Sequence, residues 1–136
     1  KVVQGHDAEP LPTGLWLREM AALANDCAGR ADFAEGHAIR RAYHLCCLCP
    51  RPLRPLLLPG YLDSDLEGFL ARGEVVQAVA LILGNGEIAI RPLDDRSGFE
   101  AQYGMGDGVH AALTARLAGL AMIGAWARFF SEQRSS

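Results

Sequence analysis

An almost wholly apolar run, Val75 to Leu83, constrains the fold of this chain more than any other segment. The run is rich in branched side chains, which is typical of a strand covered on both faces. The next residues, Gly84-Asn85-Gly86, can adopt the positive φ of a tight turn. Glu87 to Arg91 then alternates polar and apolar side chains, as a strand with one wet face does. The sequence therefore predicts a β-hairpin over residues 74–92.

A lone hairpin is only marginally stable, so other parts must cover or extend it. Val2-Val3, Leu56–Leu58 or a second subunit could add a strand beside Val75–Leu83. A small antiparallel sheet among several helical segments makes an α+β fold, and 136 residues is the usual size of one domain. We therefore expect a helix-rich single α+β domain over residues 1–136, with the hairpin packed against a long C-terminal helix.

Two amphipathic helices are expected before the hairpin. The first has Thr13 as its N-cap and ends at Gly29. The second begins with a capping-box pattern at Asp32 and ends near Cys49, because Pro50 cannot continue it. Helical spacing of apolar residues predicts that each helix buries one stripe. The stripes are Trp16, Met20, Leu23, Ala24 and Cys27 in the first helix, and Ile39, Ala42, Cys46 and Cys49 in the second.

Prolines, glycines and helix-capping patterns predict the structure of the other segments. Four prolines between Pro50 and Pro59 predict an extended backbone. A second capping-box pattern at Ser64 predicts a short helix that ends at Gly73. Residues 94–106 are expected to form a loop. A long helix is expected from Val109 to Gln133, capped by Asp107, with Ala111, Ala115 and Gly119 as a smooth ridge for close packing.

Charge and composition exclude some classes of partner. The formal net charge of −3 gives no general attraction to nucleic acid or to anionic membranes. The most apolar stretch, Leu117 to Ala127, is shorter than the roughly 20 residues of a membrane span. Clustered cysteines and no visible signal peptide favour a cytoplasmic or otherwise intracellular location. Arginine far outnumbers lysine, which fits a GC-rich bacterial or viral genome.

A run of basic residues is the main candidate binding site. No acidic residue lies between Glu35 and Asp63. Guanidinium groups pair bidentately with phosphate and carboxylate, so the run could bind an anion or an acidic partner. It could equally be a solvated face, or pair with the chain's own acidic segments at 63–67 and 94–95. The candidate anion- or partner-binding residues are His37, Arg40, Arg41, His44, Arg51 and Arg54.

Four cysteines and His44 raise the alternative of a metal site. Cys46 and Cys49 have the spacing of a metal or redox pair. They lie at a helix C-terminus, however, where the helix dipole disfavours a thiolate. We therefore expect Cys27, Cys46, Cys47 and Cys49 to be buried, unreactive thiols and expect no cofactor. A metal site formed by His44, Cys46, Cys47 and Cys49 stays as the weaker alternative.

A glycine-rich segment, residues 104–108, precedes the last expected helix. Such loops can bind phosphate through backbone N–H groups, but this one lacks the residues of known phosphate-binding patterns. A turn or hinge is the simpler interpretation. Asp107 could orient His110 as a general base, although a packing or capping role for His110 is the simpler one. No catalytic residue is assigned.

The sequence contains no complete catalytic motif, which favours a non-catalytic protein-binding or assembly module. Such a module could form a homodimer, or dock on another protein as a regulatory or accessory (adaptor) protein. The alternative is a small enzyme or ligand-binding protein that acts on an anionic small molecule. A second alternative is a metal-binding protein that uses the cysteine and histidine ligands named above.

Overall fold

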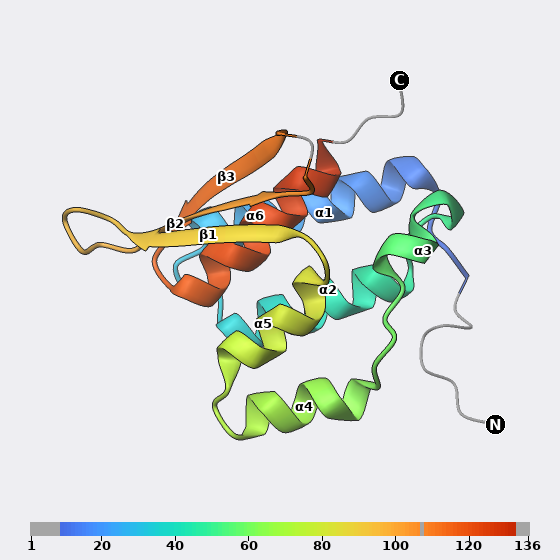
Figure 1. Ribbon diagram of the computed structural model, residues 1–136, viewed down its shortest axis with the longest axis horizontal. Coiled ribbons are helices and arrows are strands. Elements are labelled where there is room, and N and C mark those ends of the chain that lie inside the picture. Colours follow the sequence, from blue (N-terminus) through green and yellow to red (C-terminus); the bar gives the residue numbers. More distant parts are fainter. Residues whose placement is uncertain (1–8, 107, 133–136) are drawn as a thin grey trace.

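A three-stranded antiparallel sheet packs on the C-terminal helix (Figure 1). Three of the other helices also pack against that helix, and the remaining two lie farther from it (Figure 1). The computed structural model describes residues 9–106 and 108–132. Its helices are α1 (Thr13–Gly29), α2 (Glu35–Cys47), α3 (Arg54–Leu57), α4 (Asp63–Ala71), α5 (Val75–Leu83) and α6 (Ala118–Ser131), with a 3₁₀ turn η1 at Arg51–Leu53. Its strands are β1 (Glu87–Pro92), β2 (Phe99–Gly104) and β3 (His110–Ala115).

The sheet is a meander with the strand order β1-β2-β3. Strand side chains alternate between two faces, and the register therefore sets which rows meet the core. Ala101 and Leu113 are buried, and Ile90 shares their row. Gln102 is exposed on the opposite, outer face, in one row with Ala89 and Ala112. One face of the sheet thus packs on α6, and no described helix or strand covers the other.

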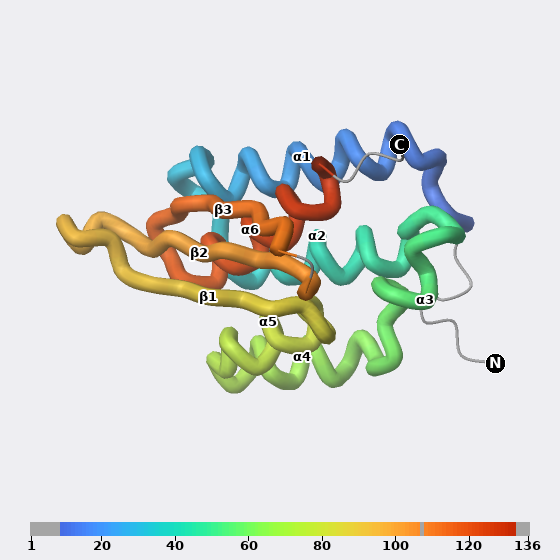
Figure 2. Tube along the Cα trace, turned by 45° about the horizontal axis from the view of Figure 1, so that its top comes forward, coloured from blue at the N-terminus to red at the C-terminus, as the bar shows by residue number. Residues whose placement is uncertain are grey.

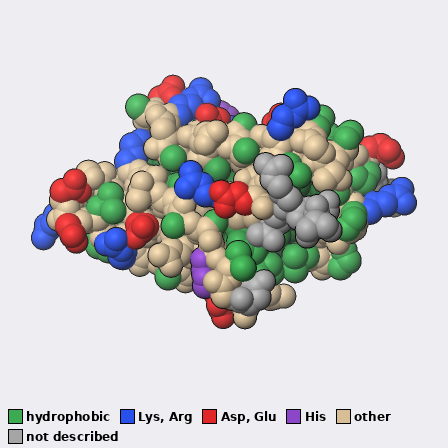
Figure 3. All heavy atoms as spheres, turned by 90° about the horizontal axis from the view of Figure 1, so that it is seen from above, with side chains coloured by type: hydrophobic (Ala, Val, Ile, Leu, Met, Phe, Trp, Pro, Cys, Tyr) green, Lys and Arg blue, Asp and Glu red, His purple; other side chains and the backbone are tan. Residues whose placement is uncertain are grey.

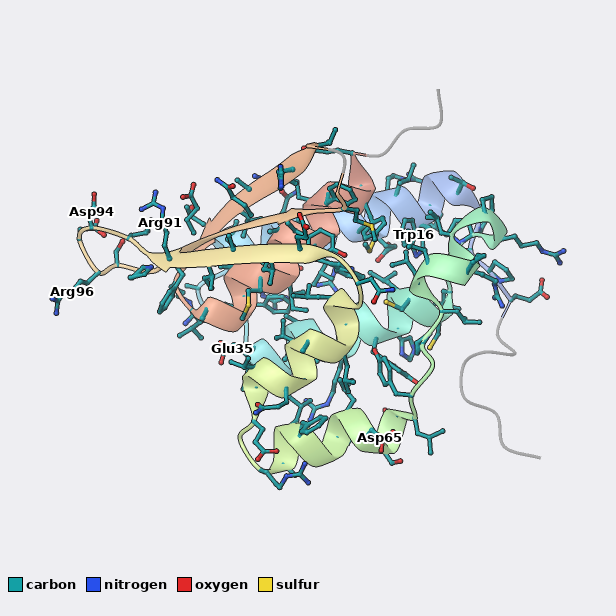
Figure 4. The ribbon with its side chains drawn as sticks, viewed as in Figure 1. Trp16, Glu35, Asp65, Arg91, Asp94 and Arg96 are labelled. Carbon is teal, nitrogen blue, oxygen red and sulfur yellow. The ribbon has the colours of Figure 1, made fainter. Side chains whose placement is uncertain are left out.

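Helix α6 is the centre of the core. Most of its side chains are buried because the sheet covers one side of it and α1 lies along another. The predicted stripe of α1 is confirmed, and Trp16 donates a hydrogen bond from Nε1 to the Leu45 carbonyl of α2 at 2.8 Å (Figure 4). The buried apolar side chains of the described residues form one continuous cluster. No helix within residues 9–106 and 108–132 is long and apolar enough to cross a membrane.

The expected α+β class, with a small antiparallel sheet on the C-terminal helix, is confirmed, but the hairpin over residues 74–92 is wrong. Val75–Leu83 is helix α5, which buries Ala78, Val79, Ile82 and Leu83 at helical spacing. A short apolar run has no period that separates a buried strand from a buried helix. Gly84, with φ +60°, ends α5 instead of forming a hairpin turn. Only the predicted second strand, β1, is confirmed.

The first hairpin of the sheet instead joins β1 to β2 through residues 93–98. The loop expected over residues 94–106 is therefore wrong for Phe99–Gly104, which forms β2. Arg96 at its tip has φ +61°. Gly86 is required for a different reason from the predicted one. A Cβ at Gly86 would collide with the Tyr103 ring, whose hydroxyl donates to the Leu83 carbonyl at 3.0 Å.

The long helix expected over residues 109–133 is also wrong in its first third. His110–Ala115 is strand β3, and α6 begins only at Ala118. Ala111, Leu113 and Ala115 are buried with less buried residues between them, a period of two that alanines conceal in the sequence. The predicted ridge is therefore divided between a strand and a helix. The predicted cap, Asp107, lies outside the described residues.

Three smaller predictions are corrected. Residues 51–57 are helical and not extended, because Pro52 and Pro55 occupy first-turn positions of η1 and α3, where a missing N–H is tolerated. Thr13 lies inside α1, and neither it nor Asp32 caps a helix; Asp32 pairs with Arg30. Leu56–Leu58 does not extend the sheet, and Val2-Val3 lies outside the described residues.

Candidate functional site

Helices α1 and α2, together with the residues just before α1, border a groove of about 550 Å³. We call it the α1–α2 groove (Figure 2 shows the two helices). Four leucines and five polar residues line it: Leu11, Leu15, Leu45 and Leu48, with Glu19, His37, Arg40, Arg41 and His44. It is the one place in the described chain where most of the predicted binding residues meet.

The α2 wall of the groove follows from helical spacing. His37, Arg41, His44 and Leu48 recur at intervals of four, three and four residues, so they share one side of the helix. A backbone hydrogen bond from Leu11 N to Leu48 O, at 2.9 Å, holds the segment before α1 against the end of α2. The Trp16 bond to Leu45 ties α1 to α2 beside the groove. The walls of the groove are therefore fixed by contacts between elements.

Both arginines of the groove are already paired with carboxylates of the chain. Arg40 donates from Nε and Nη2 to the two carboxylate oxygens of Glu67 at 2.8 and 3.0 Å. The hydrogen bonds from Arg40 lower the pKa of the Glu67 carboxyl. Arg41 donates from Nη1 to Asp26 at 2.7 Å and lies over the Phe33 ring. The internal pairing weighed for the 63–67 segment is thus present at Arg40.

Two histidines add exposed polar surface to the groove. His37 and His44 are both exposed on α2, and His37 stacks on Phe33 with ring centroids 6.1 Å apart. A neutral imidazole can donate one hydrogen bond and accept another. Glu19 is the single carboxylate among the lining residues. Four of the five polar lining residues are thus Arg or His.

The remaining predicted binding residues lie elsewhere. Arg51 begins η1 and is exposed, and Arg54 begins α3. Neither is among the residues that line the α1–α2 groove. The structure therefore brings together His37, Arg40, Arg41 and His44 and separates Arg51 and Arg54 from them.

The four cysteines are buried and carry no disulfide. Burial raises the pKa of Cys27 to about 12 and the pKa of Cys46 well above its ordinary value. Burial raises the pKa of Cys47 and Cys49 as well. A thiol held in its protonated form is a poor nucleophile and a poor metal ligand. Among the described residues, no three His, Cys, Asp or Glu side chains are arranged to hold a metal ion.

The glycine-rich segment forms the connection between β2 and β3. His110 is the first residue of β3, is exposed, and its Nδ1 lies 3.1 Å from the Gly108 carbonyl. A Cβ at Gly104 would come within 2.6 Å of the Val109 carbonyl oxygen, so this glycine allows a close backbone approach. Asp107 is outside the described residues. The predicted helix N-terminus for phosphate binding does not exist here, because His110 is in a strand.

Comparison with protein-family models, with curated proteins and with solved structures found no match to this chain.

The leucines of the groove were missed by reading the sequence. Leu15 falls outside the apolar stripe of α1, and Leu45 and Leu48 fall outside that of α2. Leu15 is 37% exposed, which is high for a large apolar residue. Leucines that lie beside the expected buried stripe of both helices were the one sign in the sequence that an apolar groove could form there.

Proposed function

We propose that the protein is a non-catalytic protein-binding module, and that its α1–α2 groove docks an apolar segment of another protein flanked by acidic side chains. One observation carries the proposal. The groove of about 550 Å³ combines four leucines with a wall of two histidines and two arginines. Apolar surfaces with a few convergent polar groups are the usual form of a binding site.

The leucines are the expected source of affinity. Burying one large apolar side chain contributes roughly 1.5–3 kcal/mol, and a few buried anchors dominate the energy of most protein interfaces. The groove has room for several such side chains. Leu15 is the most exposed large apolar residue among those named in the groove, so it offers the most area to a partner.

The α2 wall is the expected source of specificity. His37 and His44 offer exposed ring nitrogens, and Arg41 engages Asp26 through Nη1. A carboxylate of the partner can accept hydrogen bonds from these groups, and such charge-assisted bonds are stronger than neutral ones. Because each arginine already has a carboxylate partner, the wall suits one or two acidic side chains more than a multiply charged small anion.

The proposal is tested with a labelled amphipathic peptide of about twelve residues, with leucines on one helical face and aspartates on both flanks. A second peptide replaces every aspartate by lysine. Fluorescence anisotropy gives Kd for both on the full chain. We expect the aspartate peptide to bind at least about tenfold more tightly, a difference of roughly 1.4 kcal/mol.

A pair of variants on one helix locates the binding. Leu15→Glu places a carboxylate in the groove, whereas Ala22→Glu places the same group on an exposed position of α1 that does not line it. We expect Leu15→Glu to raise the Kd for the aspartate peptide by about tenfold or more, and Ala22→Glu to raise it by less than about twofold. Equal effects of the two variants, or no binding of either peptide, would overturn the proposal.

A further inference from the structure

The two edges of the sheet are treated differently. On the β3 edge, Arg128 of α6 donates from Nη1 to the Ala112 carbonyl at 2.7 Å, and α1 packs against the strand. The β1 edge has no comparable cover, because β1 packs mainly on β2 and α6 among the described elements. In Figures 1 and 2, β1 is the outermost strand of the sheet. Among the described residues, one edge is thus closed by side chains and the other is open.

The hydrogen-bonding phase of the sheet shows which groups of β1 face outward. Residues of an antiparallel pair alternate between bonding their neighbour strand and pointing away from it. The Leu93 N–H donates to the Gly98 carbonyl across the hairpin at 2.9 Å. Because every second residue of β1 bonds to β2, the backbone groups of Arg91 and Ala89 also bond to β2. The Ala112 carbonyl of β3 points outward, to Arg128, which agrees with the same alternation carried across β2. The N–H and C=O groups of Ile88 and Ile90 therefore point away from the sheet.

The side chains of β1 add a pattern to this backbone edge. Ile88 and Ile90 lie on the core side of the sheet, and Ile90 is still 40% exposed at the rim. Glu87, Ala89 and Arg91 lie on the outer face, where Arg91 pairs with Glu100 of β2 at 2.8 Å. Exposed edges are usually blocked by lysine, inward charges or a bulge. Strand β1 has no lysine and no inward-pointing charge; Glu87 and Arg91 project from its outer face, and Pro92 lacks an N–H only at its end.

We propose that the β1 edge binds an extended segment of another protein as a fourth, antiparallel strand. Its backbone would bond to Ile88 and Ile90, and its apolar side chains would cover Ile90. On the outer face, an acidic residue would lie opposite Arg91, a small residue opposite Ala89 and a basic residue opposite Glu87. Read from its N-terminus, the segment is acidic, apolar, small, apolar and basic. This surface uses different elements from the α1–α2 groove.

The same pattern occurs in β1 itself, so a second copy of the chain must be considered. A two-fold axis at Ala89 would place two β1 strands side by side, with both helix layers on one face of the joined sheet. Helix α5 lies in that layer beyond the β1 edge, on the side away from β2 (Figures 1 and 2). The two-fold would carry α5 of the second copy into the layer that α6 occupies. A single strand without helices behind it has no such conflict.

The test uses hydrogen exchange at single amides of the full chain, measured by NMR. The probe is a capped peptide with the sequence Glu-Ile-Ala-Ile-Arg, which carries the required pattern. At saturating peptide we expect exchange at the Ile88 and Ile90 amides to slow by about tenfold or more, because these N–H groups become bonded. In the same peptide with both isoleucine nitrogens methylated, these nitrogens cannot donate to the Ile88 and Ile90 carbonyls, and the methyl groups keep the peptide away from the β1 edge. This methylated peptide should therefore have no effect on exchange.

A variant pair on the protein gives a second readout. Ile90→Pro removes an outward N–H while sparing the bonds to β2, and Ile90→Thr keeps the N–H in a residue suited to strands. We expect slowing at Ile88 to vanish in Ile90→Pro and persist in Ile90→Thr. If Ile90→Pro fails to fold, the methylated peptide still decides the question.

Three outcomes contradict the proposal. The first is unchanged exchange at Ile88 and Ile90 with the unmodified peptide. The second is equal slowing by the methylated peptide. The third is slowing at both amides, without peptide, that grows with protein concentration, which would assign the edge to a second copy. None of these outcomes bears on leucine-dependent binding in the α1–α2 groove, so the two proposals fail separately.

Discussion

At the scale of single residues, one carboxylate joins two distant parts of the chain. Glu35, in the first turn of α2, accepts a hydrogen bond at Oε2 from the Gly119 N–H in the first turn of α6, at 2.8 Å (Figure 4 shows Glu35). The first N–H groups of a helix have no partner within it, and a negative charge there is favourable. The Leu117 cap residue makes no side-chain bond, so Glu35 takes over that role for the central helix.

Removing this carboxylate should destabilise the fold. We expect Glu35→Ala to lower the free energy of unfolding by about 1–2 kcal/mol, as the loss of a helix cap does. Glu35→Gln keeps an oxygen acceptor without the charge and should lose less than half as much. Urea unfolding followed by circular dichroism measures both. A Glu35→Ala variant as stable as the parent chain would contradict this role of Glu35.

A second prediction at this scale concerns the buried thiols. Because burial raises the pKa of Cys27 from 9.0 to about 12, the folded state keeps its proton where the unfolded state loses it. The stabilisation is complete below pH 9 and is lost as the pH rises toward 12. Between pH 8 and 10 we expect the free energy of unfolding to fall by about 1 kcal/mol for this thiol.

Comparing urea midpoints at pH 8 and pH 10 in reducing buffer tests this prediction. Cys27→Ala should show a smaller fall with pH than the parent chain, whatever its absolute stability. The other buried thiols and Tyr103, whose pKa burial raises to about 12, should leave a residual fall in the variant. Identical pH dependence in the two proteins would contradict the burial of Cys27.

Residue-scale features were predictable only where they were local. The buried stripe of α1 was predicted because five residues at helical spacing need no knowledge of the partner. The Arg40–Glu67 pair was foreseen as one alternative, since an acidic segment follows a basic one. The bond from Gly119 to Glu35 spans 84 positions, and no local pattern carries it.

At the scale of elements, α5 shows how tertiary packing decides an ambiguous segment. Val75–Leu83 has the composition of a strand, but it contacts α2, α4 and α6 as a helix. It turns Ala78, Val79 and Ile82 inward and leaves Val76 64% exposed. The predicted strand would have buried both faces, which an exposed Val76 rules out. Intrinsic β preference is a weak term beside such packing.

Because α5 is a helix and not a strand, the direction in which Val76→Ala changes the stability can be predicted. Alanine favours helix over valine by about 0.5 kcal/mol, so Val76→Ala should stabilise the protein by a few tenths of a kcal/mol to that amount. In a strand the same change would destabilise. Val79→Ala, at a buried position of the same helix, should cost about 2 kcal/mol and serves as the control. Thermal unfolding of both variants decides it; a lower Tm for Val76→Ala would contradict the helix.

The segment after residue 108 was misread for a related reason. Buried and less buried residues alternate in β3, but most of them are alanine or threonine. Alanine is common in helices, so this alternation does not show as a strand pattern in the sequence. The part of the predicted helix that α6 occupies is confirmed, because its residues are apolar on almost every side, as in a buried central helix. Small residues thus concealed where the strand ends and the helix begins. Two of the three strands, β2 and β3, were therefore not predicted.

At the scale of the whole molecule, the two proposed surfaces differ in kind. The α1–α2 groove is apolar with a polar wall, whereas the β1 edge offers backbone groups with one exposed isoleucine. Charged side chains of both signs gather at the end of the molecule where the β1–β2 loop projects (Figure 3). The sequence predicted the α2 side chains of the groove but not its leucines, because a groove requires two helices in their final positions.

The central claim is that the α1–α2 groove binds an apolar, acid-flanked segment of another protein. Amide chemical shifts of the isotope-labelled chain, titrated with the aspartate-flanked leucine peptide, test it most directly. We expect the largest shifts in residues 11–19 and 37–48, reduced by about tenfold weaker binding in Leu15→Glu and preserved in Ala22→Glu. Shifts confined to other elements, or equal shifts with the lysine-flanked peptide, would contradict the account.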